Sequence, residues 1–172
     1  LKTGVDVKYG LKIGQDISIQ DLRDQYDAVL ITIGASTDKK LGLEGEDADG
    51  ILSAVQFLRN VGKQEIMDLT GKQVAVIGGG NVSMDAVRTA KRLGAEKVSI
   101  VYRRRVADMT ALPDEIEGAV AEGIELQTLK APASLDVNEN HHIRGIYVTP
   151  QMVSAIKNGR ASIRPTGEIG RA

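Results

Sequence analysis

The chain has 172 residues, a formal net charge of −1 and no cysteine. This length is enough for one well-buried core with a small addition, and the near-neutral charge gives no general attraction to nucleic acid or to an anionic membrane. Without cysteine, the sequence has no disulfides, no redox CxxC pair and no cysteine-ligated iron–sulfur cluster, so any redox chemistry must use a bound cofactor.

Two further absences concern location. No apolar run approaches the roughly 20 residues that a membrane-spanning helix needs, and no basic-then-apolar leader begins the sequence. We therefore expect a cytoplasmic protein with no membrane partner. The sequence starts at Leu1 without methionine and stops in a polar stretch, so we also expect it to be a piece of something larger.

The first third of the chain predicts short elements and a connection. Residues 5–9 have the pattern of a short strand, and residues 17–24 that of a short strand or turn leading to one helical turn. The continuous apolar run 28–33 is typical of a parallel strand buried on both faces. Residues 35–50 show little periodicity and read as a crossover, after which 51–61 has helical spacing, with Ser53 as N-cap and Gly62 as stop.

The middle of the chain predicts a βαβ unit. Residues 74–77 form an apolar strand that runs into three glycines, and residues 98–102 form a second strand. Between them lies a helix with one expected apolar stripe and with Gly94 as its stop. The stripe consists of Val82, Ala86, Ala90 and Leu93. Such a unit requires parallel strands and a right-handed crossover.

The last third predicts one more helix and a small antiparallel sheet. Pro113 opens the helix, which carries Ile116, Ala119 and Val120 on one face, and Gly123 ends it. Strands are expected at 124–129, 143–148 and 161–164, with turns at 138–140 and 157–159. The expected fold is α/β: a Rossmann-like parallel sheet with helices on both faces plus a small antiparallel β appendage.

The glycine turn carries the strongest functional signal. Gly78, Gly79 and Gly80, followed by Asn81, Val82 and Ser83, match the dinucleotide pattern G-x-G-x-x-G except that Ser83 replaces the third glycine, where a small residue also serves. A strand, a glycine turn and a helix bring backbone N–H groups and the positive helix end to one point. That point suits a pyrophosphate, although a purely structural turn remains the alternative.

Three arginines follow the second strand, where a dinucleotide site for NAD would carry an acid. The guanidinium groups of Arg103 and Arg104 predict binding of the 2′-phosphate of NADP(H), since an arginine fork binds phosphate oxygens in pairs. Arg105 is expected to point to water. The alternative is a solvated cationic loop.

Other polar residues are weaker candidates. Asp85 is a candidate to cap backbone donors or to contact the nicotinamide half of the cofactor, and an acid favoured by the helix dipole is an equal alternative. Asp114, Glu115, Glu117 and Glu122 are expected to form a solvated helix face. His141 and His142 lie in a predicted turn and cannot share a ligand face, so we expect no metal site, and no residue set predicts a catalytic role.

These motifs resemble a known family. The run VAVIGGGNVSMDAVRTAKRLGAEKVSIVYRRR, with DEIEGAVAEGIEL downstream, is similar to the NADPH-binding domain of glutamate synthase small-subunit-type flavoproteins, whose relatives include dihydropyrimidine dehydrogenase and NADH-dependent ferredoxin:NADP oxidoreductase. Upstream, residues 26–35 resemble the strand at which such proteins cross from the FAD domain to the NADP domain. Residues 41–47 continue the likeness, whereas Thr110 stands where relatives often have proline.

The resemblance implies an NADP(H)-binding domain of a larger FAD-dependent oxidoreductase. Residues 1–45 would be a remnant of the FAD half and the crossover, and 46–172 the NADP(H) domain. The expected partners are the FAD domain of the parent chain and an iron–sulfur domain or partner subunit that passes electrons onward. The alternative is a non-catalytic NADP-sensing or subunit-docking domain, which the coding sequence on either side would distinguish.

Overall fold

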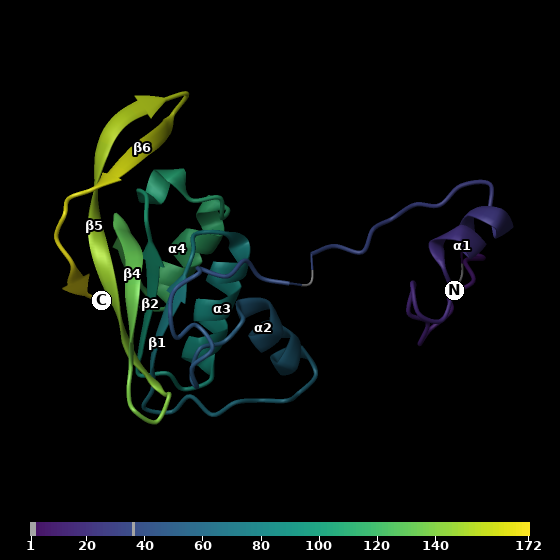
Figure 1. The fold of residues 1–172 in the computed structure, drawn as a ribbon, viewed down its shortest axis with the longest axis horizontal. Coiled ribbons are helices and arrows are strands. Elements are labelled where there is room, and N and C mark those ends of the chain that lie inside the picture. The colour runs from purple at the N-terminus through teal and green to yellow at the C-terminus, as the bar shows by residue number, and fades with distance from the viewer. Residues whose placement is uncertain (1–2, 36) are drawn as a thin grey trace. The chain divides into compact units, whose positions relative to one another are not determined.

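The computed structural model describes residues 3–35 and 37–172, and the chain divides into two units, Leu1–Ala35 and Ser36–Ala172. Residues 36–45, which the sequence assigns to the crossover, thus fall within the second unit. Figure 1 shows the elements of each unit. In the described residues no helix has both the length and the apolar character needed to cross a membrane.

The described part of the first unit contains one helix, α1 (Ile19–Gln25), which begins with a capping box. Ser18 Oγ accepts a hydrogen bond from the backbone N–H of Asp21, and the Asp21 carboxylate accepts one from the backbone N–H of Ser18. The reciprocal cap explains why most of the ambiguous segment 17–24, from Ile19 onward, forms a helix.

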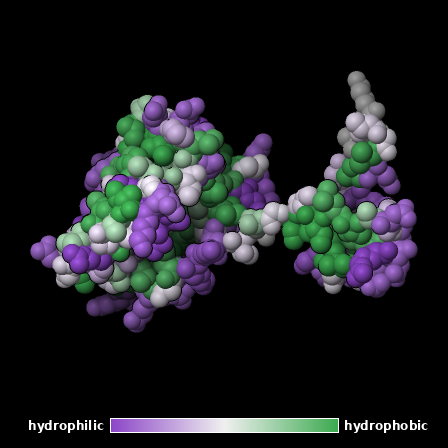
Figure 2. Space-filling view, turned by 90° about the horizontal axis from the view of Figure 1, so that it is seen from above, coloured by the Kyte–Doolittle hydropathy of each residue, from purple (hydrophilic) through white to green (hydrophobic). Residues whose placement is uncertain are grey.

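Two strands predicted for the first unit do not form. Residues 5–9 and 28–33 have no ladder partner among the described residues. Leu30 is 88% exposed and Ile33 86% exposed, so the prediction of a strand buried on both faces is wrong for this structure. Such a strand needs neighbours on both sides, and residues 3–35 of the first unit supply none. In Figure 2 a broad apolar patch accordingly covers part of the visible face of this smaller unit.

The second unit is built on a parallel sheet in the order β1-β2-β3. Strands β1 (Gln73–Ile77) and β2 (Lys97–Tyr102) pair in register from Gln73 with Lys97 to Ile77 with Val101, and β3 (Glu125–Thr128) pairs with β2. The predicted βαβ unit is confirmed, with α3 (Asn81–Arg92) as its crossover helix.

Helices cover one face of this sheet (Figure 1). They are α2 (Ala54–Gly62), α3 and α4 (Pro113–Ala121). Ser53 caps α2 as predicted, since its Oγ accepts from the N–H of Gln56 at 3.0 Å. The core between helices and sheet contains Met84, Val87, Ala90, Ile100 and Ala119, which are almost completely buried.

The buried face of α3 differs from the predicted stripe at its first member. Val82 is 45% exposed, whereas Ser83, Met84 and Val87 are buried. Val82 lies in the first turn, beside the glycine turn, where the helix has not yet reached the core. Val120 of α4 is likewise exposed, although the sequence places it on the apolar face.

The second face of the parallel sheet is covered by antiparallel strands, where the sequence predicts helices (Figure 1). Val101 and Ile77 pack there against Leu135, Ile146 and Val148. The strands are β4 (Lys130–Val137), β5 (Ile143–Lys157), β6 (Arg160–Pro165) and β7 (Gly170–Arg171). They pair in the order β4-β5-β6, with β7 on β5. The α/β class with an antiparallel addition is confirmed.

Two strand assignments change. The predicted strand 124–129 belongs to the parallel sheet as β3 and not to the antiparallel appendage, where the unpredicted β4 takes its place. The predicted turn near residues 157–159 is confirmed: Asn158 and Gly159 have φ of 49° and 76° and join β5 to β6 as a two-residue hairpin turn.

Candidate functional site

The glycine turn starts where β1 ends. The Gly78 N–H donates to the Val101 carbonyl at 3.1 Å, which continues the ladder for one step beyond the strand. Gly78 has φ 139°, and a Cβ there would lie 2.7 Å from Ser83 Oγ. Ser83 is 8% exposed and packs directly on this turn. A small side chain therefore fills the position of the third glycine, as the sequence predicts.

The start of α3 leaves backbone donors free. Gly80 is the N-cap residue and offers no side-chain cap. Among the described residues, the N–H groups of Gly79, Gly80, Asn81 and Val82 have no hydrogen-bond acceptor. Unpaired donors at the positive end of a helix form a site for an anion such as a phosphate.

A loop at residues 109–112 is fastened to the same turn. The N–H groups of Thr110 and Ala111 both donate to the Gly79 carbonyl, at 2.9 and 3.1 Å. The Leu112 N–H donates to Asn81 Oδ1 at 2.9 Å. The side-chain oxygen of Asn81 is thus engaged within the protein. Sequence patterns give no sign of this loop contact, because it joins segments about 30 residues apart.

Gly79 itself is buried against side chains. A Cβ built on it would lie 2.9 Å from Met109 Cγ and 2.9 Å from Cδ2 and Cε2 of Tyr102. The Tyr102 ring is held in place because its hydroxyl donates to the Asp108 carbonyl at 2.7 Å. The middle glycine is therefore required by close packing.

Arg103 and Arg104 leave the sheet at the same edge as the glycine turn. The register of β1 and β2 places Gly78 beside the end of β2, since Ile77 faces Val101. Arg103 is exposed and makes no hydrogen bond through its side chain within the described residues. Arg104 is half-buried, and its Nε is a buried donor without a partner there. The Arg104 carbonyl accepts from Leu129 N at 3.1 Å, which ties this loop to the end of β3.

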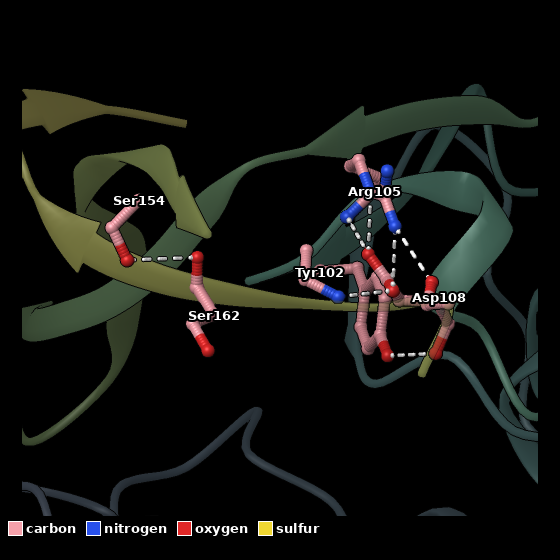
Figure 3. A network of polar contacts seen from close by, with 7 residues as sticks. Tyr102, Arg105, Asp108, Ser154 and Ser162 are labelled. Atoms are coloured by element: carbon pink, nitrogen blue, oxygen red, sulfur yellow. Dashed lines mark hydrogen bonds and ion pairs between the residues drawn. The ribbon is translucent and has the colours of Figure 1, made fainter. Parts of the chain in front are cut away.

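Arg105 does not point to water, contrary to the prediction. Its Nε donates to Asp108 Oδ2 at 2.8 Å and its Nη2 to Asp108 Oδ1 at 3.0 Å (Figure 3). The side chain of Asp108 is 1% exposed. Hydrogen bonds from Arg105, aided by one from the Ala161 N–H, hold the pKa of Asp108 well below its usual range. The i,i+3 spacing of Arg105 and Asp108 was the one signal in the sequence for this pair.

Asp85 lies on the exposed side of α3 and does not cap the helix. Among the described residues no backbone N–H donates to its carboxylate. The capping role considered from the sequence is therefore excluded, and contact with the nicotinamide half of a cofactor remains a prediction.

The acidic residues near α4 are only partly solvated, which corrects another expectation. Glu115 and Glu122 bind Arg88 of α3, each at 2.8 Å, and Glu122 also binds Arg92 at 2.8 Å. The Arg88 guanidinium lowers the pKa of Glu122. These ion pairs join α3 to α4. Asp114 and Glu117 are exposed, as the sequence predicts.

The two histidines lie in the turn between β4 and β5. Each faces an aspartate of the segment before α2: His141 Nε2 is 3.6 Å from Asp47 Oδ2, and His142 Nδ1 is 3.4 Å from Asp49 Oδ2. Within the described residues no cluster of three or more histidine, cysteine or carboxylate side chains has the arrangement of a metal site.

Comparison with known proteins identifies relatives over most of this chain. It is 39% identical over 145 residues to the beta subunit of NADP(+)-dependent formate dehydrogenase from Moorella thermoacetica, covering 83% of this chain and 20% of that protein. It is 35% identical over 153 residues to the small chain of glutamate synthase [NADPH] from Escherichia coli K12, covering 83% of this chain and 32% of that protein. The resemblance to glutamate synthase small-chain-type proteins is confirmed.

Solved structures share the fold. FprA from Mycobacterium tuberculosis in complex with NADPH matches with a TM-score of 0.73 and 20% identity, over 94% of this chain and 51% of FprA. The chain spans about a fifth to a third of the length of the two curated relatives above. The sequence model of the pyridine nucleotide-disulphide oxidoreductases matches residues 2–154, and the chain therefore belongs to this family.

Proposed function

We propose that the second unit binds NADP(H). The observation that carries the proposal is that free backbone donors at the start of α3 and two arginines, Arg103 and Arg104, lie at one sheet edge, and that neither arginine forms an ion pair within the described residues. The donors suit a pyrophosphate, which every nicotinamide dinucleotide has. The arginines suit the additional 2′-phosphate that distinguishes NADP(H) from NAD(H).

Each candidate residue has a defined part in this proposal. Gly78 shapes the turn, and the backbone N–H groups of Gly79, Gly80, Asn81 and Val82 donate to the pyrophosphate oxygens. Arg103 meets the 2′-phosphate from the solvent side, and Arg104 offers its unpaired Nε. A carboxylate at either position would repel the dianionic phosphate. Asp85, exposed one turn into α3, is the candidate contact for the nicotinamide half.

We further propose that the intact protein is an FAD-dependent oxidoreductase. Bound FAD would accept or supply the hydride, and the residues of this chain would bind and orient the nicotinamide. Residues 1–45 would belong to the FAD half and the crossover. The relatives named above are a beta subunit and a small chain, which supports a partner subunit or iron–sulfur domain that receives the electrons. A cytoplasmic location fits these partners. The 172-residue chain alone should bind NADPH weakly and turn over no substrate.

Calorimetric titration of the chain with NADPH and with NADH tests the assignment. We expect NADPH to bind more tightly, and Arg103→Glu to weaken NADPH by about 10-fold or more because a charged hydrogen bond contributes roughly 1.5–3 kcal/mol. The same substitution should change NADH affinity much less.

Arg59→Glu is the matched control, since it makes the same charge change at an exposed position of α2. It should leave both affinities close to those of the unmodified chain. Equal affinity of the unmodified chain for the two nucleotides, or equal loss of both in Arg103→Glu, would contradict the NADP(H) assignment.

A further inference from the structure

The three arginines after β2 are chemically alike, but the structure gives them different surroundings. Arg103 and Arg104 have no carboxylate partner in the described part of the chain, whereas Arg105 forms a two-nitrogen contact with Asp108. A guanidinium already paired in this way has little capacity left for a phosphate. Arg105 therefore has a task different from that of its two neighbours.

The Asp108 carboxylate is fully used within the protein. It accepts hydrogen bonds from Arg105 Nε and Nη2, from the Arg105 N–H at 3.3 Å and from the Ala161 N–H at 2.9 Å. A carboxylate with a 1% exposed side chain and four donors is a fixed anchor, because loss of any partner leaves a buried charge poorly satisfied.

This anchor joins the loop of residues 103–105, here called the arginine loop, to the tip of the β5–β6 hairpin. Besides the Ala161 bond, Arg105 Nη2 donates to the Gly159 carbonyl at 3.1 Å. The hairpin itself is held across its register shift, where Ser154 Oγ donates to the Ser162 carbonyl at 3.2 Å (Figure 3). Residues more than 50 positions away along the chain thus immobilise the loop that carries the arginines.

The anchor also connects to the glycine turn through Tyr102. The Tyr102 hydroxyl donates to the Asp108 carbonyl, and the Tyr102 ring lies under Gly79. The short segment that contains Arg103 and Arg104 is therefore held on one side by Tyr102 and on the other by Arg105. The Leu129 N–H holds the Arg104 carbonyl between these two points.

Holding this segment matters for binding. An arginine loses up to about 2 kcal/mol of side-chain entropy when it is ordered, and a mobile loop would add backbone entropy to that loss. A loop already fixed before the ligand arrives avoids the backbone part of this loss, so more of the interaction with the phosphate appears as affinity.

We propose that Asp108 is a positioning residue for 2′-phosphate recognition: by holding Arg105 against the β5–β6 hairpin, it presents Arg103 and Arg104 at the nucleotide edge. This inference rests on the proposed NADP(H) function and adds to it a specificity residue that makes no contact with the ligand. The relevant quantity is the ratio of NADPH affinity to NADH affinity, because the glycine turn serves both nucleotides equally.

The test compares Asp108→Asn and Arg105→Lys with the unmodified 172-residue chain in titrations with NADPH, NADH, 2′,5′-ADP and 5′-AMP. Asp108→Asn loses the charge of the anchor, and Arg105→Lys keeps its own charge but loses the two-nitrogen contact. We expect each to lower the NADPH to NADH affinity ratio by about 10-fold, the size of one lost charged hydrogen bond. The ratio of 2′,5′-ADP to 5′-AMP should fall in parallel, and Asp108→Glu should restore part of both ratios.

Asp136→Asn is the matched control. Asp136 is a carboxylate that also binds arginines, Arg144 at 2.7 Å and Arg171 at 3.0 Å, but it lies in the antiparallel sheet away from the β2 end. Its replacement should change stability without changing the affinity ratio. Thermal unfolding of every variant identifies any that fails to fold. If Asp108→Asn does not fold, the inference is tested with Arg105→Lys instead.

Four results would overturn the inference. If Arg105 itself binds the phosphate, Asp108→Asn frees a guanidinium, and NADPH affinity stays the same or rises. If Asp108 is merely structural, NADPH and NADH lose affinity by the same factor. If the unmodified chain does not distinguish the two nucleotides, the proposed function fails together with this inference. If the unmodified chain prefers NADPH to NADH, and Arg103→Glu abolishes this preference while Asp108→Asn leaves it intact, the inference about Asp108 is refuted and the proposed function stands.

Discussion

Replacing Gly79 with alanine should destabilise the second unit and weaken NADPH and NADH binding by a common factor. The added methyl group would lie 2.9 Å from Met109 Cγ and from two carbons of the Tyr102 ring. The methionine is flexible and can move, but the tyrosine is restrained by its hydrogen bond to the Asp108 carbonyl. The turn must therefore shift away from the ring, which displaces the backbone donors that follow it.

The expected loss of stability in Gly79→Ala follows from two opposing effects. Overpacking of a tight site costs about 1–3 kcal/mol. Gly79 does not have a positive φ, so alanine also recovers about 0.4–1 kcal/mol by restricting the unfolded chain. The net loss is about 1–2 kcal/mol, which corresponds to a fall in Tm of about 3–6 °C for a unit of this size.

Thermal unfolding followed by circular dichroism measures this loss, and titration with both nucleotides measures the binding effect. Gly62→Ala is the control, because a Cβ at the end of α2 meets no atom within 4 Å and should leave stability equal or slightly higher. An unchanged Tm in Gly79→Ala would refute the packing argument. A loss of NADPH affinity without an equal loss for NADH would refute the assignment of this turn to the pyrophosphate.

Two further outcomes follow from burial and charge. Ile100→Ala should lower the free energy of unfolding in urea by about 3 kcal/mol, because it leaves a cavity at a fully buried position, whereas Ile156→Ala, at a 57% exposed position, should change it little. Because Arg105 hydrogen bonds hold the pKa of Asp108 low, the unfolded chain protonates this carboxylate first, near pH 3.9. The contribution of the Arg105–Asp108 pair to stability is complete above about pH 5 and is lost as the pH falls. The free energy of unfolding in urea should therefore decline less between pH 5 and 3 in Asp108→Asn than in the unmodified chain. An unchanged decline would contradict the role of the Arg105–Asp108 pair.

The βαβ unit could be predicted because its signals are local. An apolar run, a glycine turn and a helical stripe specify β1 and α3 without reference to distant residues, and β2 follows at a fixed distance. The size of Ser83 also indicated its role, since it needs only to be small enough to pack on Gly78. These features depend on residues within a few positions of one another, where a single sequence is most informative.

The antiparallel sheet was harder to predict because its boundaries depend on distant pairing. The chain changes sheets at Leu129, a non-glycine residue with φ of 54°, which no composition signal marks. Its carbonyl accepts from Gln151 N, so the position is set by β5 and not by neighbours in sequence. Pro132 also made β4 harder to predict, because proline in a sequence argues against a strand. In the structure the register of β4 shifts between Pro132 and Ser134, which accommodates the proline.

The same distinction between local and distant contacts applies to the proposed nucleotide site, which consists of the glycine turn and the arginines after β2. The residue types of the proposed site are visible in the sequence, and so is the i,i+3 spacing of Arg105 and Asp108. The contacts that fix this pair are not visible, because they come from Gly159 and Ala161 on a hairpin far along the chain. The glycine turn is likewise held by the loop at 109–112, and the arginine loop by the end of β3. Segments on the C-terminal side of β2 thus determine how a ligand would meet a motif that precedes them. A fragment that ended after the arginines would keep the glycine turn and the arginines and lose the contacts that hold them in place.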